Sequence, residues 1–156
     1  MIDWLIQLGF SYSCTVAFGI LTNVPRRALN GCGITGMIGW CVFLLMRQHQ
    51  FGIGSSNFFA AFLIGVISIY FSRYKKMPVI IFSIPSLVPL VPGGPAYQAV
   101  REFVLGNSAS GFQYVVIVIL TSGAIASAFM LTSLVENIVL QWQQRYKNPS
   151  KGRGIN

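Results

Sequence analysis

The sequence predicts an all-α, polytopic membrane protein with about five transmembrane helices. Of its 156 residues, 54% are hydrophobic and only 9% are charged, whereas soluble domains have roughly 25% charged residues. The mean hydropathy is +0.65. The charged residues also divide the chain into five uncharged runs of 19 to 33 residues. A helix needs about 20 apolar residues to cross the hydrocarbon core, so each run can hold one span.

The uncharged runs place the five spans at 5–21, 28–46, 58–72, 77–97 and 113–140. The fourth span is rich in proline and glycine, and we expect it to be broken rather than continuous. These spans define an integral membrane domain over 1–144. The remaining residues, 145–156, form a basic tail that we expect to lie in the cytoplasm and to be attracted to anionic lipid.

The distribution of charge predicts the orientation of the spans. The chain carries 11 Lys and Arg against 3 Asp and Glu, a net charge of +8. If all five segments cross, nine of the 11 basic residues fall on one side: Arg26, Arg27, Arg73, Lys75, Lys76, Arg145, Lys147, Lys151 and Arg153. Short cytoplasmic loops carry the excess of Lys and Arg. The N-terminus is therefore expected outside and the C-terminus in the cytoplasm. A fourth segment that only dips into the membrane would separate these groups.

The second span contains a regular series of glycines. Gly33, Gly36 and Gly39 recur every three residues and would form a small-residue stripe on which another helix packs closely. The residues 31–36 also match GxGxxG, but this motif binds a dinucleotide only after a buried strand in a βαβ unit. We therefore interpret the glycines as helix-packing residues.

The fourth segment contains the strongest candidate site. It has five prolines, and Gly93 and Gly94 lie between Pro92 and Pro95, so a regular helix is excluded beyond about Leu90. Broken membrane helices often form the substrate site of secondary transporters, since they free backbone groups at membrane depth. The hydroxyl of Tyr97, after the expected PGGPA turn, would reach the same region. The alternative is a kinked structural helix whose PGGP is an external loop.

Few other groups could take part in chemistry. Glu136 is the one acidic residue within a span and is a weak candidate for proton coupling. It could equally be a helix-end residue that reaches toward Arg145 or lipid headgroups. The three cysteines lack metal-ligand spacing, so no metal and no cofactor are expected. No catalytic or nucleotide motif is present, and 14 charges are too few for a nucleic-acid interface.

Two motifs resemble those of a known family. They are NVPRRAL at 23–29 and VPLVPGGPAY at 88–97. With the length of the chain and its basic tail, they resemble the bacterial threonine/serine exporter family, and more narrowly the small, wholly membranous component of its two-polypeptide form. The second span is more apolar and glycine-rich than in typical members.

The resemblance implies an exporter in the bacterial inner or plasma membrane, driven by the proton motive force. Its substrates would be threonine and serine or, in some split systems, dicarboxylates such as succinate. It would act with a larger subunit that has a soluble N-terminal region and further spans, and it could form oligomers. The candidate substrate-binding residues that follow are Asn23, Pro25, Arg27, Pro92, Gly93, Gly94 and Tyr97. The rival hypothesis is a membrane scaffold or assembly protein that transports nothing.

Overall fold

The computed structural model describes residues 2–147, and it describes the surroundings of the side chains from Trp4 to Val139. Over this range the chain forms helices and no strand, which confirms the all-α prediction. In order, the elements are α1 (Ile2–Leu21), α2 (Arg26–Gln48), α3 (Ile53–Lys75), α4 (Val79–Leu87), the 3₁₀ turn η1 (Val88–Leu90), α5 (Gly93–Val104) and α6 (Ser108–Lys147).

Four of these helices are long and apolar enough to cross a membrane: α1, α2, α3 and α6. A fifth candidate span consists of two pieces, α4 with η1 and then α5, which meet at a bend of 47°. The expected pattern of about five spans, with the fourth broken, is therefore confirmed.

The prediction of a PGGPA turn was wrong, because the break lies slightly earlier. The chain leaves regular helix only at Val91 and Pro92, and α5 already begins at Gly93. Pro95 fits the first turn of a helix, where no N–H is needed. At the other end of the chain α6 reaches Lys147, so 145–147 of the predicted tail are helical. The rest of that tail lies outside the described residues.

Contacts between the helices fix their directions. An added Cβ at Gly19 would meet Leu29, and one at Gly33 would meet Tyr12, so α1 and α2 are antiparallel. On α2 and α3, Gly31 lies near Phe71 and Gly39 near Ile64, which is again antiparallel. By contrast α6 runs parallel to α3, since Gly54 lies near Leu120 and Gly65 near Thr132. The start of α2, the end of α3 and the end of α6 therefore share one end of the bundle, here called the basic end.

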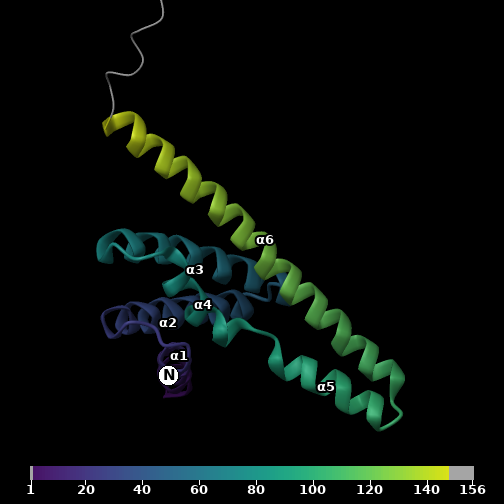
Figure 1. Ribbon diagram of the computed structural model, residues 1–156. Coiled ribbons are helices and arrows are strands. Elements are labelled where there is room, and N and C mark those ends of the chain that lie inside the picture. Colours follow the sequence, from purple (N-terminus) through teal and green to yellow (C-terminus); the bar gives the residue numbers. More distant parts are fainter. Residues whose placement is uncertain (1, 148–156) are drawn as a thin grey trace, which may run out of the picture.

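This arrangement agrees with the charge pattern. Arg26 and Arg27 begin α2, and Arg73 and Lys75 end α3. Because α6 runs parallel to α3, its C-terminal part lies on the side of the basic end (Figure 1). The first two groups of basic residues that the five-span hypothesis placed on one side thus lie at one end of the molecule, and the backbone of α6 runs toward the same end as far as Lys147.

Glycines allow close approach between the spans. Gly33 and Gly36 face Tyr12 and Thr15 of α1, while Gly39 faces Ile64 of α3. A methyl group at any of the three would overlap these side chains. The close contact also permits a hydrogen bond between helices, in which Ser11 Oγ donates to Gly36 O at 3.2 Å.

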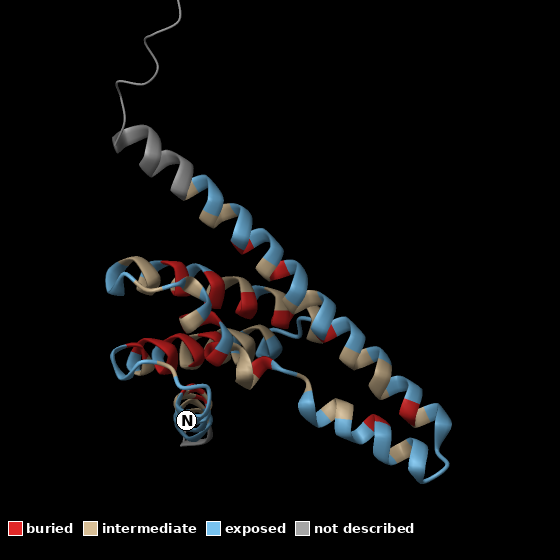
Figure 2. Ribbon diagram, in the orientation of Figure 1, coloured by how far each residue is buried: buried red, intermediate tan, exposed pale blue. Residues whose placement is uncertain are grey.

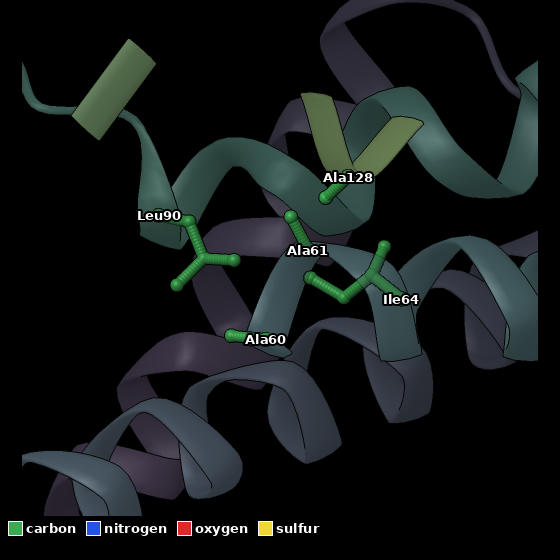
Figure 3. Close-up of a cluster of buried hydrophobic side chains, with 5 residues drawn as sticks. All are labelled: Ala60, Ala61, Ile64, Leu90 and Ala128. Carbon is green, nitrogen blue, oxygen red and sulfur yellow. The ribbon is translucent and has the colours of Figure 1, made fainter. Parts of the chain in front are cut away.

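The buried core is small and lies in two clusters. One contains Ala60, Ala61 and Ile64 of α3 with Leu90 of η1 and Ala128 of α6 (Figure 3). The other lies nearer the basic end and contains Ala28, Cys32 and Phe82. Buried residues gather on α2, α3 and α4, whereas most of α5 and α6 is exposed (Figure 2). The exposed apolar side chains are suited to lipid or to another protein.

Helices α5 and α6 form a hairpin that extends away from the other helices (Figure 1). Its turn is closed by Gly106 at φ +82°, with Gly106 N donating to Phe103 O and Asn107 N to Glu102 O. This is the Schellman arrangement that ends helices. Phe103 and Phe112 then pack edge to face, with their ring centroids 5.3 Å apart.

Candidate functional site at the broken helix

The prolines of the fourth segment remove backbone donors, and each carbonyl so freed finds another partner. Pro85 has no N–H for Ile81 O, and the thiol of Cys32 on α2 donates to that oxygen instead, with Sγ at 3.3 Å. The oxygens that Pro89, Pro92 and Pro95 leave free accept bonds from the amides of Val88, Val91 and Gly93. The carbonyls of Ile81, Pro85, Val88 and Val91 are thus paired, and pairing of buried backbone groups is what burial in a membrane requires.

The start of α5 retains one free backbone donor. Ala96 N donates to Pro92 O at 3.1 Å, and Gly93 N donates to Val91 O at 2.8 Å. None of the hydrogen bonds found between Trp4 and Val139 uses the N–H of Gly94. The first turn of a helix carries partial positive charge.

A cleft of about 260 Å³ opens beside this break. It lies between α2, α3, α6 and the segment from η1 to the start of α5. It is lined by Trp40, Phe43, Arg47, Ile53, Asn57, Pro89, Leu90, Val91, Pro92, Pro95, Ile117 and Thr121. Pockets for drug-sized ligands begin at about 300 Å³. The cleft therefore suits a small metabolite.

Three polar side chains line the cleft among otherwise apolar ones. Asn57 is only 3% exposed, and its Nδ2 donates to Ile53 O at 2.8 Å. Thr121 is equally buried, and its hydroxyl donates within α6 to Ile117 O or Val118 O. Arg47 is exposed and makes one long contact, from Nη1 to Phe51 O at 3.5 Å. Together they place one cation and two oxygen acceptors around the cleft.

A second cleft of about 240 Å³ lies next to the first. It is lined by Gln7, Phe10, Ser11, Cys14, Trp40 and Pro89, and so it extends between α1 and α2. Trp40 and Pro89 line both clefts. The indole of Trp40 stacks on Phe43 with ring centroids 5.0 Å apart. The pair Trp40 and Pro89 forms the wall between the two spaces.

Of the candidate residues in the second motif, some line the cleft and others do not. Pro92 lines the cleft. Gly93 and Gly94 lie in the exposed first turn of α5, where an added Cβ would have no neighbour within 4 Å. Tyr97 is 70% exposed and is absent from the cleft lining. Its role in substrate binding stays a prediction.

The candidates of the first motif lie elsewhere. Asn23 adopts φ +61°, with its amide donating to Ile20 O and that of Val24 to Gly19 O, so Asn23 ends α1 in a Schellman turn. Pro25 is the residue that precedes α2. Arg27 lies in the first turn of α2, about 24 Å along the helix from Phe43. The structure therefore does not bring the two motifs into one site.

Glu136 is half-buried on α6, toward the basic end. Between Trp4 and Val139 the ion pair found is Arg101 with Glu102, at 3.7 Å. No cation within that range pairs with Glu136, and no cluster of potential metal ligands occurs there. Proton coupling by Glu136 stays a prediction.

Sequence reasoning missed the polar residues of the cleft. In the sequence, Arg47 is only one of the two basic residues that fall on the side opposite the other nine. Asn57 lies one residue before the predicted start of the third span, at 58, so it was not among the candidate residues. The structure extends α3 back to Ile53, which brings Asn57 into the helix and into the bundle.

A multi-pass helical bundle with a proline-broken span beside a small, partly polar cleft has the architecture of a membrane transporter. A family model described as "Threonine/Serine exporter, ThrE" matches residues 7–135. The chain therefore belongs to the threonine/serine exporter family, which confirms the resemblance seen in its sequence. No solved structure matches the chain.

Proposed function

We propose that this chain is the membrane subunit of a secondary exporter for threonine and serine, and that the cleft beside the α4–α5 break forms part of the substrate path. The observation that carries the proposal is the position of this cleft. It lies where a broken span, the start of a half-helix and three polar side chains meet inside an otherwise apolar bundle. Succinate and related dicarboxylates are the alternative substrates.

The chemistry of the cleft supports a small polar substrate. Transporters of several folds place substrate at broken helices, because a half-helix N-terminus can face an anionic group. Here α5 begins beside the cleft, and Pro92 lines it. The carbonyls that the prolines free already accept other hydrogen bonds. Polar contacts with the substrate would therefore come mainly from side chains, notably those of Arg47 and Asn57.

We further propose the split form, in which this chain works with a larger subunit that has a soluble N-terminal region and its own spans. Five spans here and five in the partner would make a ten-span carrier. The protruding α5–α6 hairpin supports this idea, since it exposes apolar side chains that a partner could cover: Val100 is 63% and Val104 81% exposed. The hairpin would then pack on the partner as well as on lipid.

The proposed orientation places the basic end in the cytoplasm of a bacterial inner membrane and the N-terminus outside. The positive-inside rule supports this choice, because the basic loops share one end of the bundle. Arg47 and the cleft then lie toward the outer face. Export would be driven by the proton motive force, with Glu136 or a residue of the partner carrying the proton.

An efflux experiment tests the proposal. Cells that lack their own exporters are loaded with a threonine-containing dipeptide. Release of threonine is then compared for this chain alone, the larger subunit encoded beside it, both together, and neither. We expect the fastest release from the pair. Equal release from all four strains would refute threonine export and would favour a scaffold.

The scaffold hypothesis depended partly on the glycine stripe as a surface for partner helices. The structure uses Gly33 and Gly36 for α1 and Gly39 for α3. That stripe is therefore occupied within the chain itself. Because the glycines do not offer a free surface to a partner, we favour the exporter, which the cleft and the family both support.

Two substitutions compare the role of the cleft lining with that of the exposed side of α5. Pro92→Ala adds an N–H and relaxes the fixed φ at the break, so we expect efflux to fall several-fold. Tyr97, a candidate binding residue, is 70% exposed and lies outside the cleft lining, so lower efflux by Tyr97→Phe would extend the substrate path beyond the cleft, and wild-type efflux would remove Tyr97 from it. Normal amounts of both variants in the membrane are the control. Wild-type efflux by Pro92→Ala would make the break a purely structural feature.

A further inference from the structure

The cleft holds a cation without a counter-ion. Arg47 is the one charged residue that lines either cleft. Among the side chains from Trp4 to Val139 it pairs with no carboxylate, and its one hydrogen bond, to Phe51 O, is long. A guanidinium beside an apolar wall attracts an anion, and its planar donors match a carboxylate.

We propose that Arg47 binds the carboxylate of the transported amino acid, and that Asn57 accepts a hydrogen bond from its ammonium or hydroxyl group. This inference rests on the proposed function, and it assigns the cleft to zwitterionic monocarboxylates rather than to dicarboxylates. The start of α5 adds to the anionic subsite, since Pro92 and Pro95 line the cleft and the first turn of the helix carries partial positive charge.

The acceptor side of the site is built from buried groups. Asn57 is 3% exposed and lines the cleft, and one N–H of its side-chain amide donates to Ile53 O. No donor between Trp4 and Val139 reaches its Oδ1. Thr121 likewise spends its hydroxyl proton inside α6, so its oxygen can only accept. Acceptors in a cleft of low polarity suit an ammonium or hydroxyl donor.

The same inventory disfavours a dicarboxylate. Its second carboxylate would need a second cation, and the lining supplies one cation only. It would instead lie near the uncharged side chains of Asn57 and Thr121, and it would lose hydration without a compensating positive charge. One positive group and two acceptors therefore select the zwitterion.

The test measures affinity at the outer face. Right-side-out vesicles from the strain active in the efflux experiment are loaded with threonine, and counterflow of external labelled threonine gives the half-saturating concentration. We expect Arg47→Gln to raise it about 10- to 100-fold, which is the effect of losing one charge-assisted contact. Arg47→Lys keeps the charge without the planar fork and should raise it less. Arg101→Gln removes an exposed cation outside the cleft and is the matched control.

Unlabelled competitors give a second readout. In wild type, external threonine and serine should compete, whereas L-threoninol, which lacks the carboxylate, and succinate should compete weakly. Arg47→Gln should reduce the difference between threonine and threoninol. Membrane content of each variant is measured in parallel.

The outcomes separate the subsite from the exporter itself. Wild-type vesicles that exchange no hydroxy amino acid refute the proposed function, and the Arg47 assignment fails with it. Threonine exchange with unchanged half-saturation in Arg47→Gln refutes the subsite alone. If Arg47→Gln does not insert, an unchanged value in Arg47→Lys refutes it equally. Stronger competition by succinate than by threonine overturns the selectivity while leaving export intact.

Discussion

Gly36 offers a direct test of how closely α1 and α2 approach. An added Cβ at Gly36 would overlap Oγ1 of Thr15 and would lie 3.1 Å from its Cβ and 3.2 Å from its Cγ2. Thr15 is fully buried and β-branched, so its side chain has little freedom to rotate away. For Gly36→Ala, α1 must therefore move as a unit, which also weakens the bond from Ser11 Oγ to Gly36 O.

The expected magnitude follows from two opposing effects. Overpacking of a close contact costs about 1–3 kcal/mol, whereas Ala in place of Gly favours the helix by about 1 kcal/mol. Gly36→Ala should lower the free energy of unfolding by about 1 kcal/mol net. Gly123 on α6 is the matched control, because a Cβ there would meet nothing within 4 Å. Gly123→Ala should be neutral or slightly stabilising.

The assay is thermal unfolding of both purified variants in the same detergent. The difference between them removes the helix-propensity effect and isolates the overlap with Thr15. About 1 kcal/mol shifts the midpoint by roughly 2–4 °C in a chain of this size. A midpoint for Gly36→Ala equal to or above that of Gly123→Ala would refute the close packing of α1 on α2.

Two further predictions concern the break and the topology. Cys32→Ala leaves Ile81 O without its donor and should destabilise the protein by about 1–3 kcal/mol in the same unfolding assay. Adding Pro85→Ala restores a backbone N–H, so the double variant should recover stability, and a further loss would refute the role of the thiol. For topology, in a background without native cysteines, Lys75→Cys should react with a membrane-impermeant maleimide only from the cytoplasmic side. His49→Cys should react only from outside, and labelling of both from one side would contradict the crossing of the membrane by α3, which lies between them.

The number and approximate position of the spans could be predicted because charge is so costly in hydrocarbon. Uncharged runs of sufficient length must then be spans, and the loops between them collect the basic residues. The helix ends could not be predicted from charge alone, since helices continue into the polar region. Thus α3 begins at Ile53 rather than at 58, and this difference hid Asn57.

The site was harder to predict, because the same residue type serves structure or function according to its neighbours. The prolines indicated a break, but the partner of each freed carbonyl depends on tertiary contacts such as Cys32 on Ile81. Likewise Asn23 is a candidate binding residue from its sequence motif, and only the structure shows that its backbone conformation also ends α1. Arg47 becomes a candidate only when three other elements are placed around it.

The length of α6 couples the two ends of the molecule. Its 40 residues extend about 60 Å as one unbroken helix. One part of it lines the cleft beside the break through Thr121, and a later part packs on α3 through Thr132, toward the basic end. A continuous helix transmits a tilt along its whole length, because bending it would break hydrogen bonds. A tilt of α6 over α3 that widened the cleft would therefore displace its opposite end at the same time. One rigid element would thus link events at the cleft to events at the basic end.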